Sequence, residues 1–512
     1  MDGSGSGKSA SYSIPNAYQC LGSYIFTDPK GELYDRTAGY LKEQGYDIKV
    51  LNLVRPQYSD GYNPLMHISS ELDVDVIANT IVKGQKTDSG SDPYWDDMAE
   101  MLLKALIYYL IATRPEEEQN LASCAELVRA ANKNGGSNLL SDLIGQLPYD
   151  HPARMYYKSI EIAPEKTYGS ILSSLQSKLG KFDSKDIAEL TSTDTINFEE
   201  IGSKKTAVYV ISSDTHTAYD FLLTIFFSQM IQQLYDYADQ NGGRLKERTY
   251  FILDEFANIG KIPDFDKKIS TSRSRGISFS VILQNIDQLE AVYEKSYETI
   301  MGNCDTHVFL GSNSFKTVEY FSKQLGEKTI GRDSISINKD KQNHRTGKSV
   351  SDQVMARALM TPDELRRLDN DLCIIFEKGL KPVKANKFYY FKHPMAKEMA
   401  KVEISHNDIG EIDRGTWRKY NPYNPYVEDK EEEKVSNLNI ESLDDLFDDI
   451  DEKKEVDTLK KDGNSTLESV LDLGLDDAPL LPQDEEEDTY DLQKELEAKF
   501  DELFGPFDEE NN

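Results

Sequence analysis

A glycine-rich run near the start of the chain constrains the fold more than any other feature. The run ends in Gly-x-Gly-Lys-Ser, where closely spaced glycines let backbone N–H groups turn onto phosphate oxygens. Lys8 can then reach the outer phosphates of a nucleotide, and the Ser9 hydroxyl can hold Mg²⁺. Such a loop normally follows a buried strand and opens a helix. The candidate nucleotide-binding residues are Gly3, Ser4, Gly5, Ser6, Gly7, Lys8 and Ser9.

Two departures from the full phosphate-loop pattern leave an alternative open. Asp2 occupies the position of the first glycine, and only Met1 precedes the loop, so the supporting strand is missing from the sequence. We therefore expect the chain to be the remainder of a longer protein, with any membrane anchor located before Met1. The alternative is a flexible Gly/Ser leader that contains a lysine by chance.

The acidic charge is concentrated at the C-terminal end. The 512 residues have a net charge of −32, and residues 428–512 contribute −24 of it, with 32 acidic and 8 basic side chains. Composition predicts that this tail is mostly disordered. Two segments in it, Ile440–Ile450 and Tyr490–Phe507, place apolar residues at helical spacing and resemble helices that fold when bound. A purely solubilising tail is an equally good interpretation.

Cysteine usage and hydropathy indicate a reducing, aqueous environment. No apolar run reaches the ~20 residues that cross a bilayer, and no signal peptide is visible. The cysteines are too far apart for metal-ligand spacing, which fits buried thiols rather than a disulfide framework. They are Cys20, Cys124, Cys304 and Cys373.

The order of predicted elements favours an α/β fold with a parallel-rich sheet. Apolar strands at 23–27 and 47–53 are separated by a helical stretch at 34–44, which is the alternation of an α/β domain. Between residues 93 and 190 apolar residues recur at three- and four-residue steps, so we predict helices inserted into the sheet. Further strands are predicted at 207–211, 250–253, 278–283, 307–310 and 372–377, with a loop or hairpin at 331–352.

These elements divide the chain into four predicted segments. A nucleotide-binding domain is split into a first part, 1–92, and a second part, 196–420. An all-helical domain, 93–195, is inserted between them. The acidic tail is 421–512.

Two acids after a buried strand are the predicted partners of Lys8. Asp254 and Glu255 follow Tyr-Phe-Ile-Leu, at the point where such a strand leaves its sheet. Asp254 can support the metal ion, and Glu255 can orient and polarise the water that attacks the γ-phosphate. An acid buried there without a metal or a donor would be costly. The alternative is a strand followed by a solvated acidic turn.

Two further positions are catalytic candidates. Gln284 ends the next predicted strand, where a neutral amide can sense the γ-phosphate. Arg273 and Arg275 lie in a predicted loop before that strand, and an arginine there can stabilise transition-state charge, often in a neighbouring subunit. Each has a plainer alternative, which is a polar strand end for the glutamine and DNA contact or simple solvation for the arginines.

Taken in order, these residues resemble the TraG/TraD-like coupling ATPases of type IV secretion and conjugation. The resemblance covers most of residues 1–392. Its most specific part is Thr-Asp-Pro-Lys-Gly-Glu-Leu at 27–33, which on its own would indicate only a Pro-Gly turn after a strand. The other segments are Gly5–Ser9, Tyr62–Leu65, Leu253–Phe256, Gln284, Thr361–Leu365 and Gly379–Pro382.

The resemblance implies a RecA-like P-loop NTPase domain with an inserted all-helical domain, assembled as a homohexamer around a channel. It implies ATP and Mg²⁺ as cofactors, bound by the lysine and serine of the loop. Asp254 then supports the metal and Glu255 is the catalytic carboxylate. Gln284 matches a glutamine that contacts the γ-phosphate, and Arg273 matches an arginine that acts in trans.

The resemblance also implies partners and a location. Family members are held at the cytoplasmic side of the plasma (inner) membrane by an N-terminal anchor and receive single-stranded DNA with its bound relaxase. Relaxosome accessory proteins and secretion-channel components are the other expected partners. A cargo-docking adaptor with little or no ATP turnover is the alternative function, and a partition translocase with the same motor core is disfavoured by the segment at 27–33.

Overall fold

The computed structural model describes residues 7–84, 93–132, 139–213, 219–339 and 346–425. The chain divides into two units, 1–427 and 428–512, and every described residue belongs to the first. Residues 426–512 of the predicted tail, which include its two apolar segments, and residues 3–6 of the loop lie outside the described residues. The four predicted segment boundaries stay predictions.

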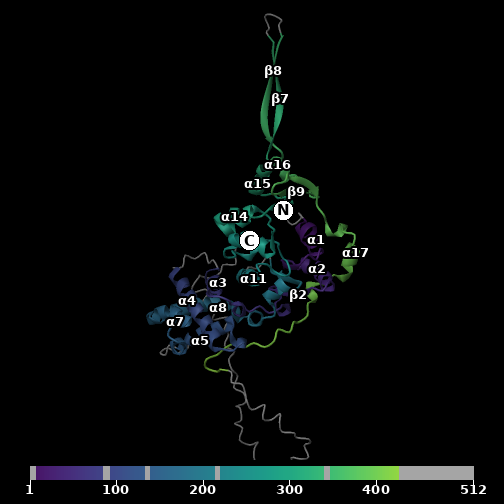
Figure 1. Ribbon diagram of the computed structural model, residues 1–512. Helices are drawn as coiled ribbons and strands as arrows, with labels where there is room; N and C mark the ends of the chain where they lie inside the picture. The colour runs from purple at the N-terminus through teal and green to yellow at the C-terminus, as the bar shows by residue number, and fades with distance from the viewer. Residues whose placement is uncertain (1–6, 85–92, 133–138, 214–218, 340–345, 426–512) are drawn as a thin grey trace, which may run out of the picture. The chain divides into compact units, whose positions relative to one another are not determined.

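A five-stranded parallel sheet contains the predicted strands of the nucleotide-binding domain (Figure 1). The strand order is β2-β3-β1-β4-β5, and every neighbouring pair is parallel. The α/β fold with a parallel sheet is therefore confirmed. The strands are β1 (Ser23–Thr27), β2 (Asp47–Asn52), β3 (Thr206–Ile211), β4 (Thr249–Leu253) and β5 (Ile277–Val281).

Side chains of the central strands alternate between two cores. On β1, Ile25 joins the larger core, while Tyr24 and Phe26 join the smaller core on the other face. The larger core contains side chains of α11 (Asp220–Gln240) and of the inserted helices. The smaller core contains side chains of α1 (Ile14–Ala17) and α2 (Glu32–Glu43). Because both faces are covered, these strands are apolar at nearly every position.

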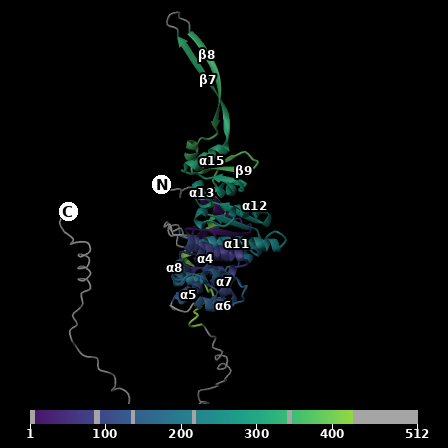
Figure 2. The same cartoon turned by 90° about the vertical axis from the view of Figure 1, so that its left-hand side faces the viewer.

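The predicted helical insertion lies between β2 and β3, which pair with each other. Figures 1 and 2 both show α4, α5, α7 and α8 gathered together. No helix in the described part of the chain is both long and apolar enough to span a membrane. The helices of this stretch are α3 (Glu71–Lys83), α4 (Pro93–Thr113), α5 (Leu121–Asn132), α6 (Leu139–Gly145), α7 (Pro152–Glu161), α8 (Glu165–Leu179), α9 (Lys185–Leu190) and α10 (Phe198–Ser203).

The last two predicted strands lie outside the five-stranded sheet, together in a smaller sheet of three strands. β6 (Thr306–Phe309) and β10 (Val383–Asn386) each pair antiparallel with β9 (Leu372–Glu377), in the order β10-β9-β6. The polar stretch is a hairpin of β7 (Glu327–Lys339) and β8 (Thr346–Ala358), which confirms one of its two predicted forms. The remaining helices are α12 (Phe265–Arg275), α13 (Ile286–Tyr293), α14 (Tyr297–Gly302), α15 (Phe315–Leu325), α16 (Pro362–Arg366) and α17 (Ala396–Met399).

Two of the resembling segments begin helical turns. At the start of α16, Thr361 Oγ1 accepts a hydrogen bond from the Glu364 N–H, and the Glu364 carboxylate accepts one from the Thr361 N–H at 2.8 Å. This reciprocal capping box satisfies two donors that a helix start leaves free. At the start of a short 3₁₀ helix, Pro64–His67, Asn63 Oδ1 accepts a hydrogen bond from the Leu65 N–H at 3.0 Å. Both segments therefore have a local structural reason for their sequence.

The Asp-Pro-Lys-Gly-Glu segment makes the tight turn from β1 into α2. Asp28 is buried, and its Oδ2 accepts a hydrogen bond from the Tyr34 N–H at 2.8 Å. Gly31 has a φ of +71°, and a Cβ there would lie 2.4 Å from the His406 ring. The buried acid and the glycine thus both serve the turn.

Burial raises the pKa of Asp28 from 3.8 to about 7, against backbone hydrogen bonds that favour the charged form. Between those two pH values the folded chain keeps a proton that the unfolded chain has lost, so stability falls as the pH rises through this window. We expect Asp28→Asn to remove that loss. The difference in free energy of unfolding between the variant and the native chain should shift in favour of the variant by up to ~4 kcal/mol from about pH 4 to about pH 8. Urea titrations of both proteins at the two pH values measure this gain, and a constant difference would contradict it.

Candidate nucleotide-binding site

The phosphate loop enters its helix at Gly7. Gly7 has a φ of +68°, in the left-handed region, and its C=O accepts the Ser11 N–H at 2.8 Å and the Ser11 hydroxyl at 2.7 Å. A π-helical turn, Ser9–Ser13, follows and continues into α1. Lys8 and Ser9 therefore stand at the first turn of a continuous helical stretch, where backbone N–H groups favour an anion.

The structure brings the loop and the acids after β4 together, as predicted. The Ser9 hydroxyl donates a hydrogen bond to Asp254 Oδ2 at 3.2 Å, although 245 positions separate the two residues. The Thr27 hydroxyl, at the end of the neighbouring strand β1, donates to the Asp254 carbonyl at 2.7 Å. Asp254 is thus fixed between the loop and the sheet.

Burial and charge act against each other at this contact. Burial lowers the pKa of Lys8, and the negative charges of Asp254 and Glu255 oppose that shift. Burial raises the pKa of Asp254, with the charge of Glu255 adding to the rise and the charge of Lys8 opposing it. Two carboxylates therefore share one half-buried ammonium group, which leaves the site with an unbalanced negative charge. A bound cation would correct that balance.

The oxygen donors present fit Mg²⁺. The Asp254 carboxylate accepts two hydrogen bonds, from the Ser9 hydroxyl and from the Glu255 N–H. Its oxygens therefore keep further acceptor capacity. A carboxylate and a hydroxyl are hard oxygen ligands of the kind Mg²⁺ takes. Within the described ranges no group of three or more acidic, histidine or cysteine side chains converges to form a metal cage. An ion held here would complete its shell with phosphate and water.

Glu255 is held by two amides and an unusual backbone. The Gln284 amide donates to Glu255 Oε1 at 2.9 Å, and the Asn258 amide donates to Oε2 at 3.1 Å. Glu255 has φ 52° and ψ 45°, the left-handed conformation that non-glycine residues rarely adopt. Such strain persists where surrounding contacts enforce it, which is common at functional sites. Gln284 therefore contacts the site by donating a hydrogen bond to the Glu255 carboxylate.

Arg273 is not brought to this site, and its predicted loop is wrong. Arg273 and Arg275 form the last turn of α12, which buries Phe265 and Ile269 and ends at Gly276 with a φ of +81°. The polar sequence at 272–275 gave no helical signal, because the apolar residues that the helix buries lie nearer its start. Because α12 leads into the amino end of β5 and Gln284 follows its carboxyl end, the strand, about 17 Å long, separates the backbone of Arg273 from that of Gln284.

The two arginines differ in their surroundings. Arg273 is 92% exposed and lies 3.7 Å from an Asp305 carboxylate oxygen. Arg275 makes two hydrogen bonds of 2.9 Å to the Asp239 carboxylate and lies over the Tyr235 ring. Arg275 is therefore held by contacts between α12 and α11, whereas the guanidinium of Arg273 is largely exposed.

Sequence reasoning missed three residues of the site. Thr27 holds the backbone carbonyl of Asp254, and Asn258 holds the carboxylate of Glu255. Only the three-dimensional structure reveals these two contacts. A Cβ on Gly7 would lie 3.0 Å from the Tyr389 ring, so an aromatic side chain lies against the loop. The run of four aromatic residues at 388–391 was a visible but unused signal.

Comparison with known proteins shows the family. The model of the family described as Type IV secretory system Conjugative DNA transfer matches residues 1–410. This chain belongs to that family. The Conjugal transfer protein TraG of Escherichia coli is 24% identical over 434 residues, covering 78% of this chain and 67% of the relative. The Protein VirD4 of Rhizobium rhizogenes is 25% identical over 422 residues, covering 78% of this chain and 59% of the relative. The family member described here thus spans about three fifths to two thirds of these relatives.

Solved structures of coupling proteins were also found. The bacterial conjugative coupling protein TrwBdeltaN70 is 17% identical, with a TM-score of 0.48 over 73% of this chain and 86% of that chain. The plasmid coupling protein TrwB in complex with a non-hydrolysable ATP analogue is 16% identical, with a TM-score of 0.48 over 78% of this chain and 89% of that chain.

Proposed function

We propose that this conjugative DNA transfer protein is an ATP-hydrolysing coupling protein. In this proposal it recruits single-stranded DNA with a bound relaxase at the cytoplasmic side of the plasma membrane. It then drives that cargo toward a type IV secretion channel, aided by relaxosome accessory proteins. The convergence of Lys8 and Ser9 with Asp254 and Glu255 at one site is the observation that supports it. A phosphate-binding cation beside a metal-supporting acid and a base is the equipment for phosphoryl transfer to water.

Each residue has a role that follows from its position. Lys8 lies where a triphosphate would meet the helix start, so its ammonium group compensates phosphate charge. Ser9 and Asp254 would hold Mg²⁺, which when bound would supply positive charge to the phosphate oxygens. Glu255 accepts a proton from the attacking water, and the amide of Gln284 keeps the carboxylate aimed at it.

The exposed position of Arg273 supports a site completed by a second copy of the chain. Gln284 follows the carboxyl end of β5, whereas Arg273 lies in α12, which leads into the amino end of that strand. A ring of copies would bring this end of one subunit to the nucleotide of the next. We therefore propose a homohexamer in which Arg273 acts in trans.

We expect Arg273→Ala to lower ATP turnover at least tenfold without lowering the thermal midpoint, because its ion pair with Asp305 is exposed. Arg275→Ala is the matched control. It loses a bidentate pair and a ring contact within one subunit, so it should reduce stability by about 1 kcal/mol. Adding Arg273→Ala subunits to chains that lack Lys8 tests the trans arrangement, since only mixed rings can combine an intact site with an intact arginine. Full turnover by Arg273→Ala alone would contradict the assignment.

DNA contact should be to phosphate and therefore sensitive to salt. Residues 1–427 are nearly balanced, with 58 acidic and 50 basic side chains, so attraction must come from local loops rather than the whole body. We expect Mg²⁺-dependent ATP hydrolysis that single-stranded DNA stimulates. The DNA concentration needed for half-stimulation should rise at least tenfold between about 50 and 200 mM salt. Hydrolysis that ignores DNA at every salt concentration would refute the DNA-driven motor, whereas an absence of hydrolysis would favour the cargo-docking adaptor.

A further inference from the structure

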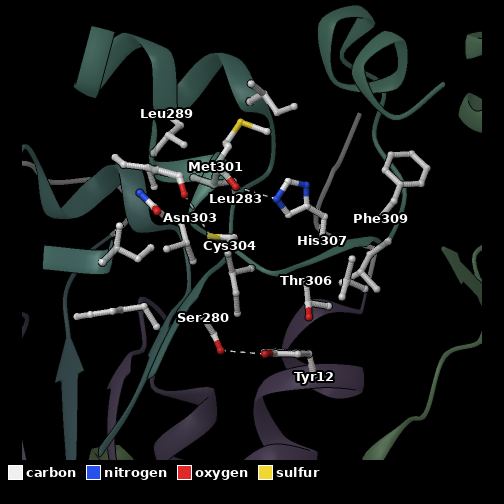
Figure 3. Close-up of a pocket in the computed structure, with 18 of the residues that line it drawn as sticks. Tyr12, Ser280, Leu283, Leu289, Met301, Asn303, Cys304, Thr306, His307 and Phe309 are labelled. Atoms are coloured by element: carbon white, nitrogen blue, oxygen red, sulfur yellow. Dashed lines mark hydrogen bonds between the residues drawn. The ribbon is translucent and has the colours of Figure 1, made fainter. Parts of the chain in front are cut away.

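The run of four aromatic residues after β10 is brought to the phosphate loop. A Cβ placed on Gly7 would lie 3.0 Å from Tyr389 Cε1. The short 3₁₀ helix Tyr390–Lys392 packs against the π-helical turn that follows the loop. Elsewhere on that turn, the Tyr12 and Ser280 hydroxyls are hydrogen-bonded at 2.8 Å, which joins the turn to β5 (Figure 3). The turn that would receive the phosphates is therefore held both by the sheet and by the aromatic run.

The aromatic run is anchored at several points, so its position is fixed. Lys387, immediately before it, is buried, and its ammonium group donates a hydrogen bond to the Leu310 carbonyl at 2.8 Å. Tyr390 packs against the smaller core. The Tyr389 hydroxyl donates to the Asn370 carbonyl at 3.3 Å. A ligand that meets this run would therefore find its rings already in place, which lowers the ordering cost of binding.

Two rings of the run form a stack that keeps one free face. The centres of the Tyr389 and Phe391 rings are 5.1 Å apart, and the ring planes differ by only 11°. The Lys392 ammonium group lies 5.0 Å from the centre of the Tyr389 ring, and the stack leaves no room for it between the rings. Tyr389 is thus covered by a ring and a cation. Phe391 is 58% exposed, so it is the member of the pair with a free face.

An exposed aromatic ring is common on protein surfaces and is not by itself a binding site. Phe388, at the start of the same run, is 51% exposed and meets the His393 ring edge-on at 6.2 Å. Phe391 differs from it in two respects. Its ring is held flat against Tyr389, and Tyr389 in turn contacts the phosphate loop. A free aromatic face fixed beside such a loop suits a ligand that carries both a flat π system and phosphate.

A nucleoside triphosphate combines these two groups. Its outer phosphates would meet Lys8 and Ser9, and a sugar separates its base from the phosphate chain. The base must therefore contact the protein beside the loop rather than on it. Tyr389 contacts the loop itself, and the Phe391 ring stands one ring spacing from Tyr389. Stacking on an aromatic side chain is open to any base, because every base has a π face.

We propose that the free face of Phe391, backed by Tyr389, is the platform on which the base of the bound nucleoside triphosphate stacks. This assignment rests on the proposed function, because it gives the place of the base of that same nucleotide. The Tyr389 hydroxyl already donates to Asn370, so the pair holds the base by its face and does not read its edge. Loss of the Phe391 ring should therefore weaken the binding of a nucleotide and leave the binding of a bare phosphate chain unchanged.

The test titrates the full chain with ATP and, separately, with inorganic tripolyphosphate, both with Mg²⁺, in a calorimeter. We expect Phe391→Ala to weaken ATP binding by roughly 5- to 100-fold and to leave the dissociation constant of tripolyphosphate unchanged. Phe391→Leu keeps an apolar side chain without a ring and should also lose ATP affinity, whereas Phe391→Tyr should retain it. Phe388→Ala is the matched control. It removes an equally exposed ring that is not part of the stack, so it should bind both ligands normally.

The two ligands separate the possible failures. Native ATP affinity in the alanine and leucine variants of Phe391 would overturn the platform. An equal loss for ATP and tripolyphosphate would also overturn it, because the ring would then support the loop rather than the base. Either result leaves the proposed function standing. Binding of neither ligand by the native chain would instead overturn the proposed function, and the platform with it. The leucine variant keeps the test decisive if the alanine variant does not fold.

Discussion

Replacing Glu255 with glutamine is expected to lower ATP turnover by roughly 10²–10⁴-fold while ATP binding stays intact. The substitution keeps the shape of the side chain but removes its ability to accept a proton from water. Gln284 and Asn258 both donate to the native carboxylate, so one of their amides loses its acceptor in the variant. Lys8, Ser9 and Asp254 are untouched. Steady-state hydrolysis and titration with a fluorescent ATP analogue measure turnover and binding separately.

The chain offers a close control for that substitution. Glu294 is also a glutamate with a positive φ, of 48°, but it is exposed and makes no contact with the site. Glu294→Gln should therefore leave turnover and binding unchanged. Asn258→Ala removes one positioning donor without removing the base, so it should give an intermediate fall in turnover and unaltered ATP affinity. Normal hydrolysis by Glu255→Gln would remove Glu255 from the mechanism.

The parallel sheet and the pairing of loop with acids were predictable because both follow from local pattern and general topology. Strands covered on both faces are continuous apolar runs, as at 250–253, and such runs stand out in a sequence. The carboxyl ends of parallel strands meet at one edge of a sheet. Asp254 and the residues that follow β1 therefore had to approach the loop, and the 3.2 Å contact with Ser9 is the result.

Other features depend on partners that a single sequence does not name. The apolar runs at 307–310 and 372–377 indicated strands, but not that they pair antiparallel with each other in a sheet of their own. Arg273 belongs to a helix because Phe265 and Ile269, at its other end, are buried. The left-handed backbone of Glu255 is enforced by its surroundings rather than by its neighbours in sequence.

Replacing Lys8 with alanine is expected to abolish ATP turnover and to weaken ATP binding by roughly 10²-fold or more. Lys8 is the cation that Asp254 and Glu255 share at this site. Its partial burial already lowers its pKa and so disfavours the charged form. Without it, triphosphate oxygens would meet two carboxylates and no side-chain cation from the loop. Titration with a fluorescent ATP analogue measures the loss. Lys30→Ala is the control, because Lys30 is an exposed lysine in the turn after β1 and should not affect binding.

The two variants together separate the interpretations left open by the sequence. A motor binds ATP without hydrolysing it when Glu255 is replaced, and binds poorly when Lys8 is replaced. A Gly/Ser leader that contains a lysine by chance would give the opposite result for Lys8, since its removal would leave the dissociation constant unchanged. The contact between Ser9 and Asp254 argues against such a leader, because a leader has no reason to dock on an acid beside a buried sheet. An unchanged dissociation constant for Lys8→Ala would nevertheless overrule that geometry.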